Sequence, residues 1–329
     1  MRPLLPLAPI LSSAAVAAVA AVAVTQRPTA GVSDHGATAP LSELPHDPGP
    51  PPPDQPVELG LVHWLRDYDA ALTRARTEGK PVFVLFQEVP GCGNCTRYGR
   101  EILSHPLIVE SIETDFVPLA IFNNRGGADA EVLRRYGEPA WNNPVVRIVD
   151  ANGGDLIGRL ASFGSPALLT GGMVEALAGF AEAHPESDAA APAYLRLVAE
   201  EYAHRESVTD VATFETACFW SGEGYLGAQP GIVSTAAGWQ DGREVVRVEY
   251  SRQHTSAEAL ASAAAAKGYR LRDNGEFRLD AQPKYYLTTS PYAGIEMTEL
   301  QASRANALLG RGERPDALLS PRQLARLRP

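Results

Sequence analysis

Two of the three cysteines in this 329-residue chain stand three positions apart. Cys92 and Cys95 directly follow an apolar run, residues 81–89 (PVFVLFQEV), which is typical of a buried strand. A cysteine that begins the next helix meets unpaired backbone N–H groups and the positive end of the helix dipole, which together stabilise a thiolate. We therefore expect Cys92 to be the attacking thiol and Cys95 the resolving thiol.

Two other interpretations of this cysteine pair stay open. A zinc site would need a second pair of ligands, and no further Cys-x-x-Cys or His-x-x-x-His follows, so we expect no metal. A plain structural disulfide would join Cys92 and Cys95 without any redox role.

The third cysteine, Cys218, is followed by two large aromatic residues, Phe219 and Trp220. A cysteine beside aromatic residues is also a common core feature, so its interpretation depends on groups farther along the chain. Glu244 opens an alternating strand pattern, and the ionisable groups Asp280 and Tyr285 follow five positions apart. Taken singly, Cys218, the two aromatic residues and Glu244 fit a buried core and a charge on a strand face as well as they fit a reactive site.

Helix and strand patterns alternate around Cys92 and would position it. Helical spacing covers residues 63–78 and 96–103, on either side of the pair. The remaining elements expected here are a strand over 116–122, a helix over 128–136, a strand pair over 144–149 and 156–160, and a closing helix over 166–183.

This order of elements around a Cys-x-x-Cys pair resembles the thioredoxin family. The resemblance implies an α/β fold, dithiol redox chemistry and a cis-proline facing the cysteines at the start of the third strand. Pro144 stands at that place, and we expect it to contact the substrate. The surroundings depart from the family pattern, because Gly91 precedes Cys92 where thioredoxin itself has tryptophan.

The C-terminal half predicts the order β-α-β-β-α-β of a ferredoxin-like α/β sandwich. An Asp241-Gly242 hairpin signal joins its two central strands. The elements are expected, in chain order, as strand 211–219, helix 221–227, strands 231–239 and 244–250, helix 256–267, strand 283–289 and a closing helix over 298–309.

The segment Ala217-Cys218-Phe219-Trp220, with Glu223 nearby, is similar to the Gly-Cys-Phe-Trp-Gly-x-Glu signature of A-type peptide methionine sulfoxide reductases. The chain departs from that family at both signature glycines, in a shorter connection between the second and third strands, and in having no cysteine after Cys218 to act as a resolving thiol. Further blocks resemble the family in the same order, at residues 230–235, 244–250, 280–285 and 297–301.

The second resemblance implies a mechanism in which Cys218 attacks the sulfoxide sulfur and Glu244 protonates the oxygen. Methionine leaves, and Cys218 becomes a sulfenic acid; this family acts on the S epimer. The other implied roles are an apolar wall for the substrate methyl group from Phe219 and Trp220, a hydrogen bond to the oxygen from Tyr285, and orientation of the polar network by Asp280.

The two halves suggest one hypothesis, in which Cys92 reduces the oxidised Cys218 within the same chain and Cys95 closes the disulfide. The expected substrate is oxidised methionine in proteins or peptides, the electron donor is an external thiol reductant, and no bound cofactor is expected. One alternative is a thiol–disulfide oxidoreductase whose C-terminal domain is a non-catalytic docking module. Another is a non-catalytic interaction protein with a structural Cys92–Cys95 bond.

The N-terminus resembles a targeting segment, since Arg2 precedes an uncharged apolar run over residues 4–24. A cleaved signal peptide and a retained membrane anchor both fit, and both place the rest of the chain outside the cytoplasm, in the periplasm or secreted. A hydrophobic helix docked on a soluble domain is the third interpretation. We expect membrane contact only through this segment.

Composition excludes several classes of protein. Lys and Arg number 29 and Asp and Glu 39, for a net charge of −10, so the broad positive surface that nucleic-acid binding needs is not expected.

The expected organisation is a signal peptide or anchor (1–24), a Pro-rich linker (25–56), a thioredoxin-like domain (57–185), a linker helix (186–206), a reductase-like domain (207–310) and a solvated Arg-rich tail (311–329).

Overall fold

A computed structural model of the chain describes residues 54–141, 144–161, 164–185, 190–273 and 275–327. The predicted targeting segment and the Pro-rich stretch as far as residue 53 lie outside these residues and stay predictions. Within the described part, no helix is both long enough and apolar enough to cross a membrane.

The N-terminal sheet has three strands with the longest apolar run at its centre. Strand β1 (Val82–Gln87) pairs in parallel with β2 (Val117–Phe122) and antiparallel with β3 (Val145–Val149). Every residue of β1 is buried, because helices cover both faces of the sheet. Alternate side chains divide between the faces, with Phe83 in one hydrophobic cluster and Val84 in the other.

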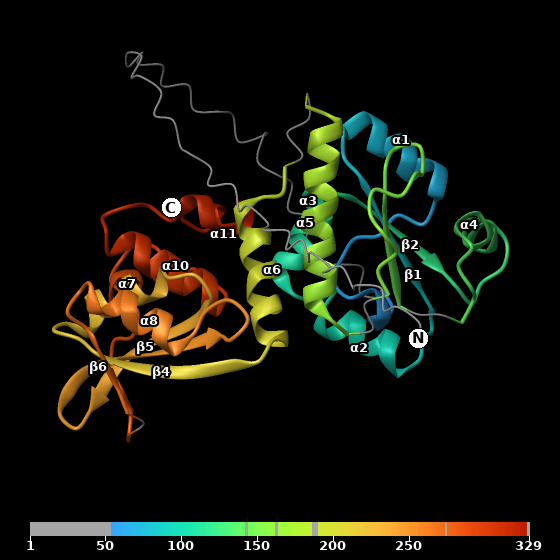
Figure 1. The fold of residues 1–329 in the computed structure, drawn as a ribbon. Helices are drawn as coiled ribbons and strands as arrows, with labels where there is room; N and C mark the ends of the chain where they lie inside the picture. The colour runs from blue at the N-terminus through green and yellow to red at the C-terminus, as the bar shows by residue number, and fades with distance from the viewer. Residues whose placement is uncertain (1–53, 142–143, 162–163, 186–189, 274, 328–329) are drawn as a thin grey trace, which may run out of the picture. The chain divides into compact units, whose positions relative to one another are not determined.

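The helices form two layers around this sheet (Figure 1). One cluster joins the sheet to α1 (Tyr68–Glu78) and α4 (Ala128–Tyr136). The other cluster contains residues of α2 (Gly93–Glu101), α3 (Pro106–Thr114), α5 (Pro166–Ala183) and α6 (Ala193–Glu206).

Two predictions for this half are wrong in detail. The helix expected from residue 63 begins at Tyr68, because Asp67 caps it by accepting a hydrogen bond from the Ala70 N–H. The strand expected over 156–160 is absent from the described residues, where only isolated bridges link Asp155 and Leu160 to β3.

One helix of this half escaped prediction. The sequence analysis expected a helix over 96–103, but α2 runs from Gly93 to Glu101 and a separate helix, α3, begins at Pro106. Pro106 is the first residue of α3, a position where its missing N–H costs nothing.

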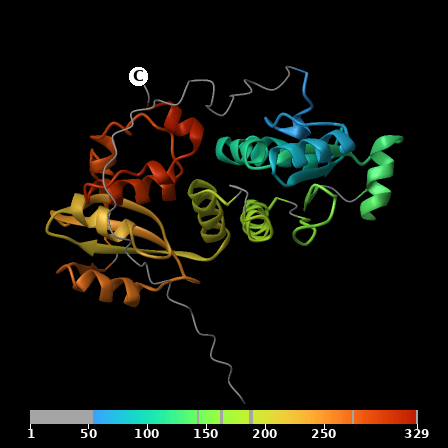
Figure 2. The same cartoon turned by 90° about the horizontal axis from the view of Figure 1, so that it is seen from above.

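The C-terminal sheet is antiparallel and has the strand order β7-β4-β6-β5-β8. Strand β6 lies between β4 and β5, which α7 connects, and this is the split β-α-β arrangement of a ferredoxin-like sandwich. The predicted mixed α/β and α+β class is therefore confirmed. The elements are β4 (Thr209–Glu215), α7 (Phe219–Gly227), β5 (Ile232–Gln240), β6 (Arg243–Ser251), α8 (Ala257–Ala265), β7 (Arg270–Arg272) and β8 (Arg278–Leu279) (Figure 1 and Figure 2).

The hairpin between β5 and β6 turns at Asp241-Gly242, as the sequence predicts. Both residues have positive φ, 51° and 73°, which is the geometry of a two-residue type I′ turn. This turn sets the register in which Trp239 faces Glu244 across the strands.

The fourth strand of the sandwich is β7, and the prediction of a strand over 283–289 is wrong. Residues Tyr285–Thr288 form a short helix, α9. Two side chains accept hydrogen bonds from backbone N–H groups of this segment that a strand would need for pairing. Glu223 accepts from the Lys284 N–H at 2.7 Å, and Asn306 accepts from the Leu287 N–H at 3.1 Å.

The Arg-rich tail is not a solvated end. Beyond α10 (Glu299–Leu309) it forms α11 (Pro321–Ala325), and Ser320, just before α11, is fully buried. The Arg322 guanidinium lies 2.5 Å from the Glu113 carboxylate of α3. Tertiary ion pairs of this kind leave no periodic pattern in a sequence.

Candidate functional site

The Cys-x-x-Cys pair lies where β1 ends and α2 begins. Cys92 is the N-cap of α2, and its side chain is exposed, whereas Cys95 is buried in the first turn. Both thiols are free, and their Sγ atoms lie 3.8 Å apart. A small movement of one side chain would bring the sulfurs to the roughly 2 Å of a disulfide.

The two thiols differ in acidity. The backbone N–H of Cys95, followed by that of Asn94, lowers the pKa of the Cys92 thiol. Burial raises the pKa of the Cys95 thiol to about 11. The exposed member is therefore the readier thiolate, which supports the predicted division into attacking and resolving cysteine.

Two buried polar residues support the loop before Cys92, and the sequence analysis missed both. A Glu58 carboxylate oxygen accepts a hydrogen bond from the Gly91 N–H at 2.7 Å. The Gln87 amide donates to the Glu58 backbone carbonyl at 2.5 Å and to that of Cys95 at 3.3 Å. A polar residue at the end of an apolar strand, such as Gln87, is the signal that could have revealed this support.

The glycine before Cys92 has a packing reason. A Cβ atom on Gly91 would lie only 2.5 Å from the Cys95 Cβ and 2.5 Å from the Glu88 carbonyl oxygen. The bulky residue that thioredoxin itself carries there would not fit this loop.

Pro144 is buried directly before β3. The antiparallel register places Val145 opposite Phe86, so Pro144 lies at the end of the sheet from which the cysteine loop leaves. The peptide bond between residues 143 and 144 falls outside the described residues, so its expected cis geometry stays a prediction. Among the described peptide bonds, Val89–Pro90 is cis.

Three possible metal ligands also meet at this loop. One donor atom each of Glu88, Cys92 and Cys95 lies within 4.8 Å of the others. Three ligands are the set of an open catalytic zinc site, but a dithiol active site brings its two sulfurs together in the same way. The cluster therefore does not favour a metal over redox chemistry.

Cys218 also caps a helix. It is the N-cap of α7 and is half-buried. The next backbone N–H, that of Phe219, donates to a Glu244 carboxylate oxygen at 2.8 Å. The structure thus brings together the predicted nucleophile and the predicted acid, which lie 26 positions apart in the sequence.

An aromatic wall surrounds these two residues. The Phe219 ring lies 5.5 Å from Trp220 and 5.3 Å from Trp239, and the latter contact is edge-to-face. Trp220 stacks on Tyr285 with 4.0 Å between ring centres and 13° between planes. The predicted substrate wall and the predicted phenol therefore lie in direct contact.

Asp280 joins the same site from the segment after β8. Its backbone N–H donates to the Ala237 carbonyl at 2.9 Å. Its pKa lies below the ordinary value: partial burial acts to raise it, but hydrogen bonds, of which the one from the Gln282 N–H is the strongest, together outweigh that effect. The Trp239 and Trp220 indoles add to this lowering, although the Trp220 Nε1 has no hydrogen-bond partner within normal limits. We infer a carboxylate that faces the aromatic wall.

Glu223 holds the predicted site residues in place. It is fully buried in α7, and burial raises its pKa. It accepts hydrogen bonds from the Thr235 hydroxyl at 3.3 Å and from the Lys284 N–H at 2.7 Å. These bonds tie the Tyr285 segment to the helix that begins at Cys218.

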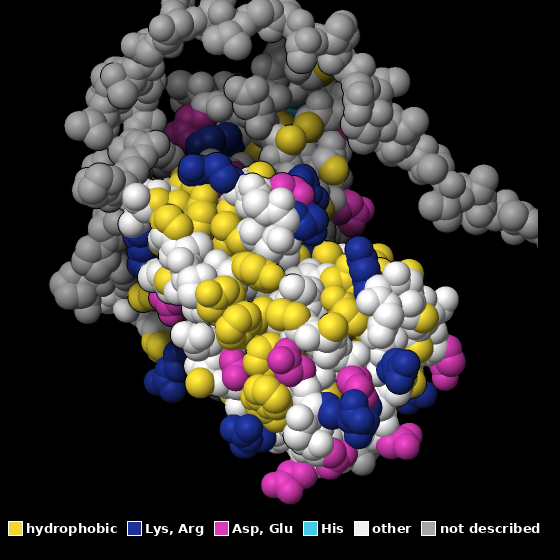
Figure 3. Space-filling model, turned by 90° about the vertical axis from the view of Figure 1, so that its left-hand side faces the viewer, with side chains coloured by type: hydrophobic (Ala, Val, Ile, Leu, Met, Phe, Trp, Pro, Cys, Tyr) yellow, Lys and Arg dark blue, Asp and Glu magenta, His cyan; other side chains and the backbone are white. Residues whose placement is uncertain are grey.

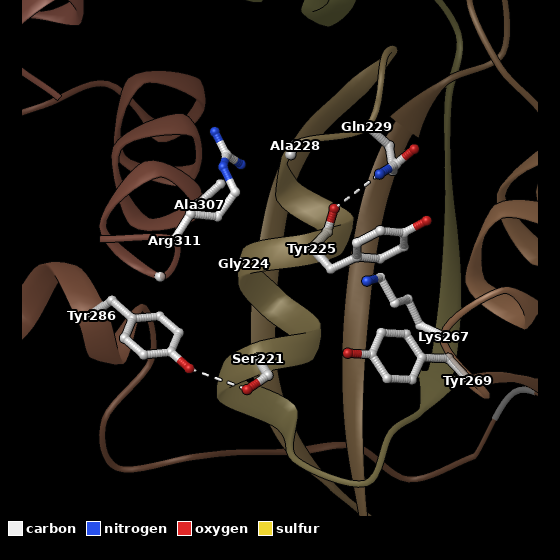
Figure 4. Close-up of a pocket in the computed structure, with 11 residues that line it drawn as sticks. Ser221, Gly224, Tyr225, Ala228, Gln229, Lys267, Tyr269, Tyr286, Ala307 and Arg311 are labelled. Carbon is white, nitrogen blue, oxygen red and sulfur yellow. Dashed lines mark hydrogen bonds between the residues drawn. The ribbon is translucent and has the colours of Figure 1, made fainter. Parts of the chain in front are cut away.

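A pocket of about 480 Å³ opens beside this site (Figure 4). Burial, followed by the electrostatic influence of Cys218, raises the pKa of Tyr269. No motif marked this pocket in the sequence. Its principal lining side chains are Ser221, Tyr225, Lys267, Tyr269, Tyr286 and Arg311.

Comparison with known proteins identifies the N-terminal half. Residues 63–151 match a family of thioredoxin-like domains, so this region is a thioredoxin-like domain. A solved structure described as "DsbH Oxidoreductase" matches 32% of this chain and 76% of its own, with 18% identity and a TM-score of 0.27. None of the curated proteins matches the chain.

Proposed function

We propose that this protein is a thiol-dependent oxidoreductase in which Cys218 reduces methionine S-sulfoxide in proteins and the Cys92–Cys95 dithiol supplies the electrons. The observation that carries the proposal is the grouping of Cys218, Glu244 and the Trp220–Tyr285 stack around one helix start. A core cysteine needs only apolar neighbours, whereas sulfoxide reduction needs a proton donor beside the thiol.

The chemistry follows from these positions. The Cys218 thiolate attacks the sulfoxide sulfur while Glu244 delivers a proton to the sulfoxide oxygen. This attack forms an S–S bond between Cys218 and the substrate. The hydroxyl group then moves from the substrate sulfur to the Cys218 sulfur as the S–S bond breaks, so methionine leaves and Cys218 becomes a sulfenic acid. Trp220 and Phe219 offer an apolar surface to the substrate methyl group, and Tyr285 offers a hydroxyl to the oxygen.

The dithiol would then restore Cys218. Cys92 attacks the sulfenic sulfur, water leaves, and a Cys92–Cys218 disulfide forms. Cys95 attacks that disulfide, which frees the Cys218 thiol and leaves a Cys92–Cys95 disulfide. Two electrons and two protons thus pass from the dithiol to the sulfoxide, and an external thiol reduces the dithiol for the next round.

The second candidate is a thiol–disulfide oxidoreductase whose C-terminal half only docks substrates. The exposed position and lowered pKa of Cys92 favour it, because they are sufficient for disulfide exchange without Cys218. Under this candidate the aromatic wall would bind apolar segments of a client protein.

We also propose that the protein works outside the cytoplasm. This rests on Arg2 and the apolar run over residues 4–24, which lie outside the described residues. Cell fractionation of the tagged full-length protein tests it, and recovery in the cytoplasm alone would reject it.

The deciding experiment measures methionine released from each epimer of an N-blocked methionine sulfoxide, with excess dithiothreitol as the reductant. We expect turnover of the S epimer and none by Cys218→Ser. Absence of turnover in the wild-type protein, with insulin disulfides still reduced, would reject the first candidate in favour of the second.

A further assay isolates the electron path. With a protein reductant in place of dithiothreitol, replacement of Cys92 and Cys95 by serine should limit the protein to a single round of sulfoxide reduction. Unchanged multiple turnover would reject the in-chain donor while leaving the Cys218 chemistry intact.

A further inference from the structure

The pocket beside Cys218 contains two polar groups that make no hydrogen bond or ion pair with another described residue. The ammonium of the exposed Lys267 lies 5.3 Å from the centre of the Tyr225 ring and pairs with no carboxylate among the described residues. The Tyr269 hydroxyl has no hydrogen-bond partner there either. Figure 4 shows both groups pointing into the hollow.

The other polar side chains of the pocket each make a contact within the protein. The Tyr225 hydroxyl donates to the Ala263 carbonyl at 3.0 Å, and the Tyr286 hydroxyl lies 3.1 Å from the Ser221 hydroxyl. The Arg311 Nε pairs with Glu313 at 2.7 Å. The Lys267 ammonium and the Tyr269 O–H therefore remain as donors without such a contact among the described residues.

The pocket is close enough to Cys218 to share a ligand with it. Ser221, on its wall, follows Cys218 by three positions in one helix, a rise of about 4.5 Å. Neighbouring residues of an extended peptide are about 3.3–3.6 Å apart. A peptide whose sulfoxide reached Cys218 would therefore place a residue one or two positions away at this pocket.

We propose that this pocket binds the acidic side chain of a residue next to the methionine sulfoxide, with Lys267 and Tyr269 as the groups that select it. This inference rests on the proposed function and names its substrate class. A carboxylate satisfies both free donors, and the tyrosine rings suit the methylene groups of a glutamate side chain.

The overall charge of the chain supports recognition by a particular ammonium group. On the face shown in Figure 3, acidic and basic side chains are interspersed around a band of hydrophobic ones. The whole chain carries a net charge of −10, so its average field repels a carboxylate. Selection of an acidic residue would therefore depend on Lys267 itself.

The test compares two peptides with blocked termini that differ only in Glu or Gln beside methionine S-sulfoxide, with dithiothreitol as the reductant and the full chain as the enzyme. We expect kcat/KM to be about fivefold higher for the Glu peptide. Lys267→Met should remove the preference and leave the Gln peptide unaffected. Arg252→Gln, which loses one positive charge at an exposed position outside the pocket, should retain it.

A third peptide separates the two sources of a carboxylate. It has Gln in place of Glu beside methionine S-sulfoxide. Its C-terminus is left unblocked, so that a free carboxylate directly follows the sulfoxide residue. A preference for this peptide and not for the Glu peptide would overturn the acidic side chain as ligand. Equal rates for all peptides, or a preference that survives Lys267→Met, would overturn the pocket as the selecting site.

A binding measurement keeps this inference distinct from the proposed function. The same peptides are titrated by calorimetry into Cys218→Ser, alone and combined with Lys267→Met. Tighter binding of the Glu peptide that needs Lys267 would support the pocket even if the wild-type protein shows no turnover. Equal binding of the peptides would overturn it.

Discussion

Cys92 and Cys218 occupy the same local position, because each is the N-cap of a helix that follows a strand. Their neighbours differ. Cys92 is exposed and faces a second sulfur at 3.8 Å, whereas Cys218 is half-buried and has Glu244 bound to the next backbone N–H. In the proposed function, the first arrangement supplies two electrons as a dithiol, and the second places a proton donor beside a thiol.

The difference shows that a position at a helix N-terminus does not by itself decide which substrate a cysteine attacks. The backbone N–H groups at the start of α2 lower the pKa of the Cys92 thiol. What the thiolate attacks is decided by the groups around it, a buried thiol in one half and an aromatic wall in the other. Replacing each set of groups in turn should therefore separate two activities.

The largest expected effect comes from the nucleophiles themselves. Cys92→Ser should lower insulin disulfide reduction by about a thousandfold or more and leave dithiothreitol-driven sulfoxide reduction intact. Cys218→Ser should do the reverse. If either variant loses both activities while circular dichroism shows a folded protein, the two sites do not act separately with small reductants.

The predicted proton donor comes next. Glu244→Gln should lower kcat/KM for the sulfoxide about a hundredfold or more, because the amide cannot deliver a proton to the sulfoxide oxygen. Glu249→Gln is the matched control, because Glu249 lies on the same strand and contacts Ser234 at 3.2 Å instead of the Cys218 helix. Equal losses in the two variants would show that a carboxylate on β6 matters only for folding.

The unequal acidity of the dithiol predicts a difference in alkylation. In the reduced protein, the rate at Cys92 should rise with a midpoint below pH 9.0, and the rate at Cys95 with a midpoint near pH 11. At pH 8 iodoacetamide should therefore label Cys92 about a hundredfold faster, as mass spectrometry of timed samples would show. Comparable rates would contradict the assignment of Cys92 as the attacking thiol.

The smallest expected effects concern the glycines that pack against each helix start. Gly91→Ala and Gly222→Ala should each lower the free energy of unfolding by about 1–3 kcal/mol, because the added Cβ would lie 2.5 and 2.6 Å from its nearest neighbour. Gly93→Ala and Gly224→Ala have room and should change it by less than about 0.5 kcal/mol. Denaturant unfolding curves compare the pairs.

The sequence predicted the regular elements best where one apolar pattern lay within one element. Helices α4 and α5 begin and end at the predicted residues, and α6 ends at the predicted residue 206 but begins at Ala193 and not at residue 186. The apolar pattern over 283–289 predicted a strand, and this prediction is wrong, because the segment contains the same apolar residues that a strand would have. Bonds from Glu223 and Asn306 to its backbone, made across long sequence separations, fold it as a helix instead.

The sequence by itself determined which residues are candidates for chemistry, because residue type and spacing along one strand or helix are local properties. It also separated the dithiol from the lone cysteine. Only the tertiary structure decided that Glu58 supports the cysteine loop, that the tail packs on Glu113, and that Lys267 and Tyr269 meet beside Cys218. Such contacts join distant segments, and hydrophobic periodicity reports that a side chain is buried without reporting what it is buried against.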